Sequence, residues 1–396
     1  MANERGGRAL VVGAGIGGLA TALRLRRGGW HVLVVEKAPE LRCGGYVTNF
    51  SGVGYDAAEH LGLLPALVGV RQPMTDLVYV DESGARLAVL PAAANEAMIG
   101  PRSLTLLRGD LETVLHQALD EQVDLRFGRT VTEVEQDGEG VSVVLDDGTR
   151  HRVDLLVGAD GVHSPLRARV FGPEERYRDD LGHAVASIEV DRTPVEVPPV
   201  TTMGIGLVGR GLGVTSLPDG RCAVLFAFRS DSVDADLAAG AATTLRRVFG
   251  DLGWLAPDLL SRVDRDESVY FDRICQIRMP RWHDGRIVLL GDSAWCVSLF
   301  AASGASLALG GAKLLGDLLD EHPGDVPAAL AAWEERFRPV VTAKQKEALR
   351  ATAMFVAPSA FAVKVRAAAF RLSGTRPVVW LARRFFGHRE TAAERT

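Results

Sequence analysis

Three glycines near the start of the chain have the spacing that lets a backbone turn approach a phosphate group. The sequence GAGIGG supplies Gly13, Gly15 and Gly18 in the order G-x-G-x-x-G, and Ile16 and Gly17 complete the turn. The first glycine permits a tight turn, the second lets the backbone approach a pyrophosphate, and the third lets the following helix pack closely on a strand. The N–H groups at the start of that helix would face the anion. The pattern therefore predicts a dinucleotide site.

An acidic residue follows the glycine turn at the separation that ribose binding requires. Glu36 lies 18 positions after Gly18 (36 − 18), at the end of the apolar run 31–36, and Lys37 comes next. A carboxylate there can accept hydrogen bonds from ribose hydroxyl groups. The order strand, glycine turn, helix, strand is a βαβ unit with parallel strands, which favours dinucleotide binding over a merely structural turn. This unit alone leaves both FAD and NAD open.

Two later motifs, each directly after an apolar strand, narrow the choice. GADGVHSPLR contains Asp160, and GRIVLLGDSA contains Gly291 and Asp292. Together with the glycine turn, they resemble the three signatures of the aromatic-hydroxylase-like flavoprotein monooxygenases, a family that includes tetracycline-inactivating and polyketide-tailoring enzymes. The resemblance extends over nearly the whole chain, up to about residue 343. It implies a single-component enzyme that binds FAD.

The resemblance also implies roles for individual residues. Asp292 should meet the ribityl chain or the pyrophosphate of FAD, and a helix that begins near Gly304 and Ala305 should point its N–H groups at the flavin ring. A helix N-terminus stabilises the negative charge that develops on a reduced flavin. Asp160 corresponds to the aspartate that relatives use in handling flavin and nicotinamide. The other positions assigned to the cofactor are Lys37, Arg42, Arg108 and Val131, with a surface salt bridge as the alternative for the two arginines.

The loop that follows Asp292 departs from the family pattern. Relatives often read GDAAH and then a proline, whereas this chain reads GDSAWCVSLFAASG, with Trp295 in place of the histidine and Leu299 in place of the proline. We expect Trp295, Leu299 and Phe300 to form an apolar chamber beside the substrate. Excluding water matters there because water promotes the loss of peroxide. The sequence of this loop therefore does not decide whether oxygen is transferred. It does not affect the prediction that flavin binds.

The middle of the chain offers candidates for a substrate wall. Met203 could share a sheet face with Phe226 and Phe228, because alternate side chains of a strand lie on one face. An apolar stripe of this kind is also what an ordinary core requires, so both interpretations stay open. Tyr270 and Arg273 could contact a phenol or acid group of a substrate, with a structural role as the alternative.

The changes of pattern along the chain predict an α/β fold: a doubly wound Rossmann-like FAD-binding domain with an inserted β-sheet substrate domain and a helical C-terminus. The FAD-binding domain is assigned to residues 1–72, 102–182 and 280–343. The β-sheet substrate domain is assigned to residues 73–101 and 183–279, with one helical interruption near residues 235–249. Residues 344–396 are assigned to the C-terminal helical segment.

Composition limits the classes of partner. The chain has 396 residues, a net charge of −5 and a pI near 6.0, so no basic field favours nucleic acid. Four widely spaced cysteines and no histidine cluster predict reduced thiols in the cytoplasm and no metal site. No apolar signal segment or bilayer-length apolar run is present. We expect a cytoplasmic monomer or homodimer that binds a small hydrophobic molecule. Membrane contact through the basic, apolar tail is less favoured than a helical cap.

These observations predict the transfer of one oxygen atom from O2 to a small hydrophobic, aromatic or polyketide-like secondary metabolite, with NADPH or NADH reducing the FAD. The flavin carries the chemistry, so no catalytic side chain is assigned. One alternative is a dehydrogenase, reductase or cyclase that inserts no oxygen. Another is a halogenase, for which the W-x-W-x-I-P motif is missing. The third is a flavin-binding sensor without turnover, since a fold does not determine a function.

Overall fold

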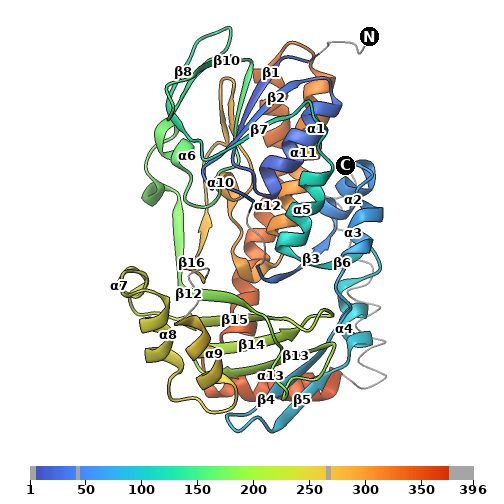
Figure 1. The fold of residues 1–396 in the computed structure, drawn as a ribbon, viewed down its shortest axis with the longest axis vertical. Helices are drawn as coiled ribbons and strands as arrows, with labels where there is room; N and C mark the ends of the chain where they lie inside the picture. The colour runs from blue at the N-terminus through green and yellow to red at the C-terminus, as the bar shows by residue number, and fades with distance from the viewer. Residues whose placement is uncertain (1–5, 42–44, 265–268, 374–396) are drawn as a thin grey trace.

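The computed structural model of the chain describes residues 6–41, 45–264 and 269–373. A mostly parallel sheet, packed against helices and a smaller sheet, forms the upper part of the molecule in Figure 1, and a second large sheet forms the lower part. Long helices connect the two parts. The predicted α/β class is confirmed.

The upper sheet has six strands in the order β17-β18-β11-β1-β2-β7. All neighbouring strands are parallel except β17 and β18. Its central strands are apolar along most of their length because both faces are covered, one by helices and the other by the small sheet of residues 131–153. The strands are β1 (Arg8–Val12), β2 (His31–Glu36), β7 (Asp124–Phe127), β11 (Leu155–Gly158), β17 (His283–Asp284) and β18 (Ile287–Leu289).

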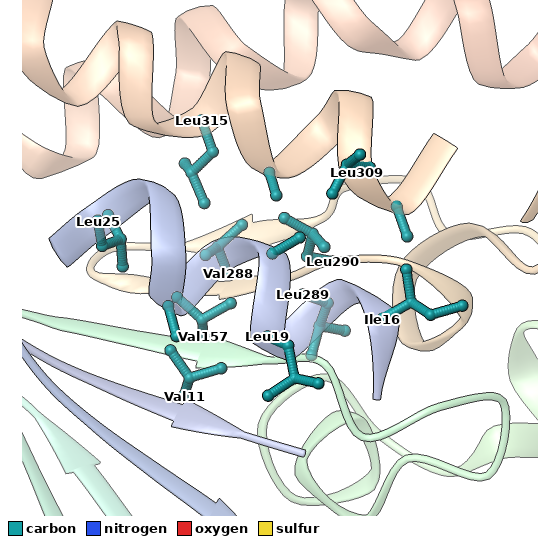
Figure 2. Close-up of a cluster of buried hydrophobic side chains, with 14 of the residues drawn as sticks. Val11, Ile16, Leu19, Leu25, Val157, Val288, Leu289, Leu290, Leu309 and Leu315 are labelled. Atoms are coloured by element: carbon teal, nitrogen blue, oxygen red, sulfur yellow. The ribbon is translucent and has the colours of Figure 1, made fainter. Parts of the chain in front are cut away.

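Helix α1 (Ile16–Arg27) packs between this sheet and helix α11 (Gly304–Glu321). Figure 2 shows side chains of α1 meeting those of β1, β11, β18 and α11 in one buried core. Arg24 of α1 also forms ion pairs with Asp317 (3.0 Å) and Asp320 (2.5 Å) of α11. The two helices whose N-termini the sequence assigns to the cofactor are therefore fixed to one another.

Two smaller sheets and several short helices complete the upper part. One sheet has three antiparallel strands, and the other is a single antiparallel pair. The strands are β8 (Val131–Gln136), β9 (Val141–Leu145), β10 (Arg150–Val153), β3 (Val47–Ser51) and β6 (Ser103–Leu107). The helices are α2 (Val53–His60), α3 (Leu64–Gly69), α5 (Arg108–Gln117), α6 (Pro165–Val170) and the 3-10 turn η1 (Glu174–Arg176).

The lower sheet has seven strands in the order β16-β12-β15-β14-β13-β4-β5, and only β13 and β4 are parallel neighbours. Most of its strands come from the middle of the chain, whereas β4 and β5 come from an earlier segment. The strands are β4 (Asp76–Val80), β5 (Arg86–Leu90), β12 (Arg178–Val190), β13 (Thr201–Leu207), β14 (Arg210–Ser216), β15 (Cys222–Arg229) and β16 (Tyr270–Ile277).

Three helices follow β15, where the sequence predicts one helical interruption near residues 235–249. They are α7 (Val233–Ala239), α8 (Ala241–Phe249) and α9 (Ala256–Val263). The predicted extent is therefore too short. The apolar residues of α9, Leu259 among them, face the same core as those of α8, and burial of this second apolar stripe accounts for the extra helix.

The C-terminal helices reach the opposite face of the seven-stranded sheet. Helix α12 (Val326–Phe355) runs along α11, and α13 (Ala360–Ser373) lies against β5 and β13. Figure 1 shows α13 crossing behind this sheet, and α4 (Ala92–Ile99) packs near its edge strand β4. Within the described ranges, no helix combines the length and the apolar character needed to cross a bilayer.

Candidate active site

An open cleft lies where the carboxyl ends of β1, β11 and β18 face the seven-stranded sheet. Open α/β sheets bind ligands at the carboxyl ends of their strands. Segments that are far apart in the sequence meet here. Its walls include Gly15, Arg108, Val185, Ile274, Asp292 and Gly304.

The glycine turn between β1 and α1 forms one edge of the cleft. Gly13 has a φ of 103°, and a Cβ there would overlap the carbonyl oxygen of Ala159. A Cβ at Gly18 would overlap the carbonyl oxygen of Gly13, so only glycine lets α1 start this close to β1. The cleft itself is lined by Gly15, Ile16 and Gly17. Bare backbone therefore stands where the sequence predicts a pyrophosphate.

Glu36 stands at the end of β2 with both carboxylate oxygens held by the backbone. Its Oε2 accepts a hydrogen bond from the N–H of Ala14 (2.8 Å), and its Oε1 accepts one from the N–H of Ala38 (2.8 Å). These bonds fix the carboxylate beside the glycine turn. Each oxygen keeps a lone pair that a ribose hydroxyl can use.

The other residues that the sequence assigns to this end of the cofactor differ in exposure. Lys37 is exposed beside Glu36, and Val131 is buried at the start of β8. Arg42 lies outside the described residues. The cofactor contacts of Lys37 and Val131 stay predictions.

Charged groups of opposite sign line the middle of the cleft. Arg108, the first residue of α5, forms an ion pair with Glu112 (2.8 Å). Asp292 begins the short helix α10 (Asp292–Trp295) directly after Gly291. Asp292 is open to the cleft, but the surrounding protein atoms reduce its hydration and raise its pKa, and the positive charge of Arg108 opposes that rise. Arg108 and Asp292 can therefore offer a hydrogen-bond donor and an acceptor to one polar ligand chain.

The start of α11 opens onto the cleft, since Gly304 and Ala305 both line it. The first N–H groups of a helix have no partner within the helix and carry partial positive charge. The loop before α11 contains the 3-10 turn η2 (Leu299–Ala301) and holds Ser298 and Ala302 at φ values of 89° and 47°. Left-handed backbone costs a non-glycine residue about 1–3 kcal/mol, so the packing around this loop must enforce it.

The aspartate of the DG motif is turned toward its own loop. Asp160 accepts hydrogen bonds from the hydroxyl of Ser164 (2.5 Å) and from the N–H of Leu166 (3.0 Å). It thereby fixes the start of α6, while its neighbours Ala159 and Gly161 line the cleft. Direct contact of Asp160 with flavin or nicotinamide stays a prediction.

Arg167, in the same motif, links this loop to the one after β18. Its side chain is fully buried, donates to the carbonyl oxygens of Ser293 (2.9 Å) and Val162 (2.6 Å), and pairs with Glu174 (3.0 Å). The Ser293 hydroxyl in turn donates to the carbonyl oxygen of Gly158 (2.6 Å). The motif is visible in the sequence, but its partners become clear only when the two loops are seen side by side.

The predicted contact of Trp295 with a substrate is wrong. Its indole ring is 1% exposed and packs against Trp282 (4.7 Å between ring centroids), Trp333 (5.6 Å) and Phe337 (5.4 Å). Trp333 and Phe337 belong to α12. The short helix α10 therefore turns this side chain into the core against α12, whereas the next residue, Cys296, lines the cleft.

The rest of the predicted chamber is divided between cleft and core. Leu299 lines the cleft. Phe300 is buried, stacks on Phe355 (5.0 Å between ring centroids) and does not line it, so its predicted substrate contact is wrong. Phe300 belongs to the η2 turn, and its buried ring fixes the turn against the core.

The predicted substrate wall lies on the wrong face of the sheet. Met203, Phe226 and Phe228 are buried in the core beneath α8 and α9, out of reach of a substrate. Leu225 and Ala227, which alternate with the two phenylalanines, lie on the face that borders the cleft. The alternation shows which residues share a face, but it does not show which face the helices cover.

Polar residues of β16 line the cleft beside the DG loop: Tyr270, Asp272 and Arg273. Asp272 lies 3.1 Å from Nε2 of His163, whose Nδ1 lies 3.1 Å from Glu174. The hydrogen bond to Asp272 raises the pKa of His163 to about 9, although partial burial opposes the rise. A protonated imidazole therefore joins the loop to the sheet at neutral pH. Substrate contacts of Tyr270 and Arg273 stay predictions.

These groups fit FAD. Bare backbone at Gly15 and Gly304 lies on two sides of the cleft, and the helix N-termini behind these glycines favour negative charge. Ser303, next to the start of α11, has a buried hydroxyl with no hydrogen-bond partner in the part of the chain that the structure describes. A polar cofactor ring could supply that partner.

Comparison with known proteins assigns the class. Residues 8–347 match the family described as FAD binding domain, and the chain belongs to this family. Its curated relatives include flavin-dependent monooxygenases, so the protein is an FAD-dependent monooxygenase. The predicted family, enzyme class and FAD cofactor are confirmed. Dioxygen and a nicotinamide reductant are the co-substrates that this class implies.

Three similar proteins cover nearly the whole chain. A flavin-dependent monooxygenase from an unknown prokaryotic organism is 30% identical over 345 residues, which are 85% of this chain and 87% of that one. Tetracycline destructase Tet(55) superposes with a TM-score of 0.81 at 26% identity, covering 97% of each chain. Klebsiella pneumoniae HpxO, crystallised with FAD and uric acid, shares the fold with a TM-score of 0.77 at 23% identity, covering 96% of each chain.

Proposed function

We propose that this protein uses NADPH or NADH to insert one oxygen atom from O2 into a small hydrophobic, aromatic or polyketide-like metabolite, by hydroxylation or epoxidation. The observation that carries the proposal is the position of the cleft, between three cofactor motifs and an apolar sheet face. Val185 and Ile274 of the seven-stranded sheet line the cleft, and so does Leu299 of the η2 turn. Small-molecule sites favour such boundaries between parts of a fold.

The same boundary separates the residues that we assign to FAD from those that we assign to the substrate. We assign FAD to residues 1–72, 102–182 and 280–343. We assign the substrate to residues 73–101 and 183–279. Two observations support this division: β4 and β5 belong to the seven-stranded sheet, and all three cofactor motifs belong to the upper part.

When bound, FAD accepts a hydride from the nicotinamide and activates dioxygen. The chain's own residues position it. In our proposal, the glycine turn holds the pyrophosphate, Glu36 accepts hydrogen bonds from the ribose, and Arg108 and Asp292 contact the ribityl chain. The N-terminus of α11 stabilises negative charge on the ring. Leu299 and its apolar neighbours exclude water from the site of oxygen transfer.

Incubation of the FAD-loaded protein with NADPH or NADH, candidate metabolites and isotopically labelled dioxygen tests this function. We expect one labelled oxygen atom in the product, measured by mass spectrometry, and substrate-accelerated oxidation of the nicotinamide. Conversion of a substrate under strict anaerobiosis, with no label in the product, would contradict the proposal.

A dehydrogenase, reductase or cyclase without oxygen insertion is the second candidate. The loop at Leu299 favours it, because this loop departs from the family sequence and its backbone is strained at Ser298 and Ala302. Anaerobic conversion would establish this candidate. A flavin that neither nicotinamide reduces would instead indicate a sensor without turnover.

A further inference from the structure

Four glycines occupy one face of β13 and β14. Gly204 and Gly206 alternate along β13, and Gly211 and Gly213 alternate along β14. The register pairs Gly204 with Gly213 and Gly206 with Gly211. The residues between them point into the core beneath α8 and α9, so the glycines lie on the face that borders the cleft. None of the four has a positive φ, so their backbone conformation does not require glycine.

Two of these glycines make room for the C-terminal helices. A Cβ at Gly206 would overlap the guanidinium of Arg366, which donates a 2.8 Å hydrogen bond to the carbonyl oxygen of Gly206. A Cβ at Gly211 would lie 3.0 Å from the carbonyl oxygen of Phe355. Gly206 and Gly211 are therefore explained by the close packing of α13 and of the end of α12.

The other two glycines face open space. A Cβ at Gly213 would meet no heavy atom of the described chain within 4 Å, and a Cβ at Gly204 would meet only backbone, the nearest atom being the carbonyl oxygen of Leu212 at 3.4 Å. Glycine inside a strand weakens the strand, and its usual reasons are a bulge, a bend, or the close approach of another backbone or a ligand. The register of β13 and β14 is continuous here, and no described atom of another segment lies within 4 Å of a Cβ at Gly213, so we take the approach of a ligand as the reason.

Gly204 and Gly213 lie in one row across the sheet with a residue that lines the cleft. One row of neighbours across the sheet consists of Tyr270, Ser187, Leu225, Gly213, Gly204 and Tyr79. Tyr270 at one end of this row lines the cleft, and so does Val185 in the next row. The bare backbone of the pair therefore lies on the sheet face that borders the cleft, between Leu225 and Tyr79, whose ring lies under the guanidinium of Arg366 (5.3 Å).

Ser187 supplies a second, independent observation in the same row. Ser187 is 4% exposed, and its hydroxyl has no hydrogen-bond partner among the residues that the structure describes. A buried hydroxyl without a partner is costly and is normally satisfied. Because Ser187 is paired with Tyr270 and Leu225, it lies on the face that borders the cleft.

We propose that Gly204 and Gly213 form the floor of a substrate subsite that takes the distal ring of a flat, oxygenated, multi-ring molecule, and that Ser187 hydrogen-bonds to an oxygen of that molecule. Without side chains, the sheet lets a planar ring approach the backbone directly. This inference rests on the proposed function and specifies its substrate as polycyclic. A single ring would leave the glycine floor uncovered.

Calorimetric titration of the FAD-loaded protein tests the subsite with two probes: 1,8-dihydroxyanthraquinone, which has three fused rings, and catechol, which has one. The variant Gly213→Leu places an apolar side chain in the proposed subsite, at a position where a Cβ meets no atom of the described chain within 4 Å. We expect it to raise the Kd of the three-ring probe at least about tenfold and that of catechol less than about twofold. Gly213→Ala should give a smaller increase for the three-ring probe, and it keeps the test valid if the leucine variant fails to fold.

Two further variants complete the design. Gly138→Leu is the matched control, because a Cβ at Gly138 also meets no atom within 4 Å but lies between β8 and β9, away from the cleft. It should change neither Kd. Ser187→Ala should raise the Kd of the three-ring probe about three- to tenfold. It should not lower the Tm of the protein without probe, since the Ser187 hydroxyl has no hydrogen-bond partner in the described ranges.

The subsite is overturned if wild-type protein fails to bind the three-ring probe, or if Gly213→Leu weakens both probes equally or neither. Failure of the proposed function has a different signature. In that case the three-ring probe binds and Gly213→Leu weakens it, but labelled oxygen never enters a product. Oxygen transfer that Gly213→Leu leaves unchanged for a three-ring substrate would sink the subsite and leave the function intact.

Discussion

The guanidinium of Arg167 donates a 2.9 Å hydrogen bond to the carbonyl oxygen of Ser293 and so joins the loop after β11 to the loop after β18. Ser293 directly follows Asp292, which lines the cleft. Arg167 itself does not line it. The geometry of the cofactor site therefore depends on a buried residue that we do not expect to touch the cofactor.

Replacing Arg167 with methionine should destabilise the protein and weaken FAD binding together. The variant takes the donor away from the carbonyl oxygens of Ser293 and Val162 and removes one ion-pair partner of Glu174, which keeps Arg178 and His163. A buried acceptor left without its donor costs about 1–3 kcal/mol. Urea unfolding and FAD titration measure the two effects. The exposed Arg169→Met in the same helix is the control and should change stability by less than about 0.5 kcal/mol. Equal stability of the two variants would contradict the role of Arg167.

Glu36→Ala should weaken FAD binding more than it affects folding. Hydrogen bonds to a charged acceptor contribute about 1.5–3 kcal/mol, so we expect the Kd of FAD to rise about ten- to more than a hundredfold. Fluorescence titration of the protein with FAD measures this change. Glu40→Ala, at an exposed position, is the control. An unaltered Kd in Glu36→Ala would show that the ribose binds elsewhere.

Leu299→Asp should separate nicotinamide oxidation from product formation. A carboxylate at this position brings water into the cleft, and water promotes the release of peroxide in place of oxygen transfer. The ratio of hydrogen peroxide to oxidised nicotinamide should rise severalfold, as a peroxidase-coupled assay would record. Leu299→Met keeps the position apolar and should leave the ratio at the wild-type value. A Leu299→Asp protein that stays fully coupled would argue against a dry chamber.

His163 should make stability depend on alkaline pH. Its pKa is about 9 in the folded chain, against 6.5 for an ordinary histidine, so the protonated ring favours the folded state. The contribution is complete below pH 6.5, declines between 6.5 and 9, and is absent at higher pH. Glu174 also faces His163 and is itself paired with Arg167 and Arg178.

The comparison of wild type with His163→Gln isolates this effect. The Tm difference between the two proteins should be largest near pH 6 and vanish near pH 10. It should also shrink in high salt, because the His163 side chain is 47% exposed. A Tm difference that does not change with pH would rule out the protonated bridge.

Trp295→Ala should act on stability and leave substrate binding unchanged. Removing an indole from the cluster with Trp282 and Trp333 creates a cavity and should cost about 3–5 kcal/mol. Trp295→Phe keeps an aromatic ring and should cost less. Thermal unfolding and calorimetric titration with 1,8-dihydroxyanthraquinone would separate the two properties. A large loss of probe affinity in Trp295→Phe would indicate that Trp295 contacts the substrate after all.

The cofactor side of the molecule could be predicted because its signals are local. Gly13, Gly18 and Glu36 belong to one βαβ unit, and the backbone geometry of that unit fixes their relative positions. The class of fold, the family and FAD followed from this unit and two further short motifs. Each motif carries its own strand and turn, so no long-range contact had to be known.

The substrate side could not be predicted in the same way because it depends on contacts between distant segments. The pattern at Phe226 and Phe228 shows a shared face, but α8 decides that this face is buried, and the glycines on the opposite face gave no apolar signal. Trp295 was assigned to the cleft from its place in a motif, whereas α12 holds its ring in the core. His163 and Asp272 are 109 positions apart, and no spacing rule connects them.

The cluster of Trp282, Trp295 and Trp333 gives the protein an optical property. The three ring centroids lie 4.7–5.6 Å apart, and Trp295 ends the helix that Asp292 begins at the cofactor cleft. Tryptophan emits light in the near ultraviolet, where flavins absorb, so excitation passes from these indoles to a flavin held nearby. The intrinsic emission of the protein should therefore dim as FAD enters the cleft and brighten as it leaves, which makes loading measurable without any added label.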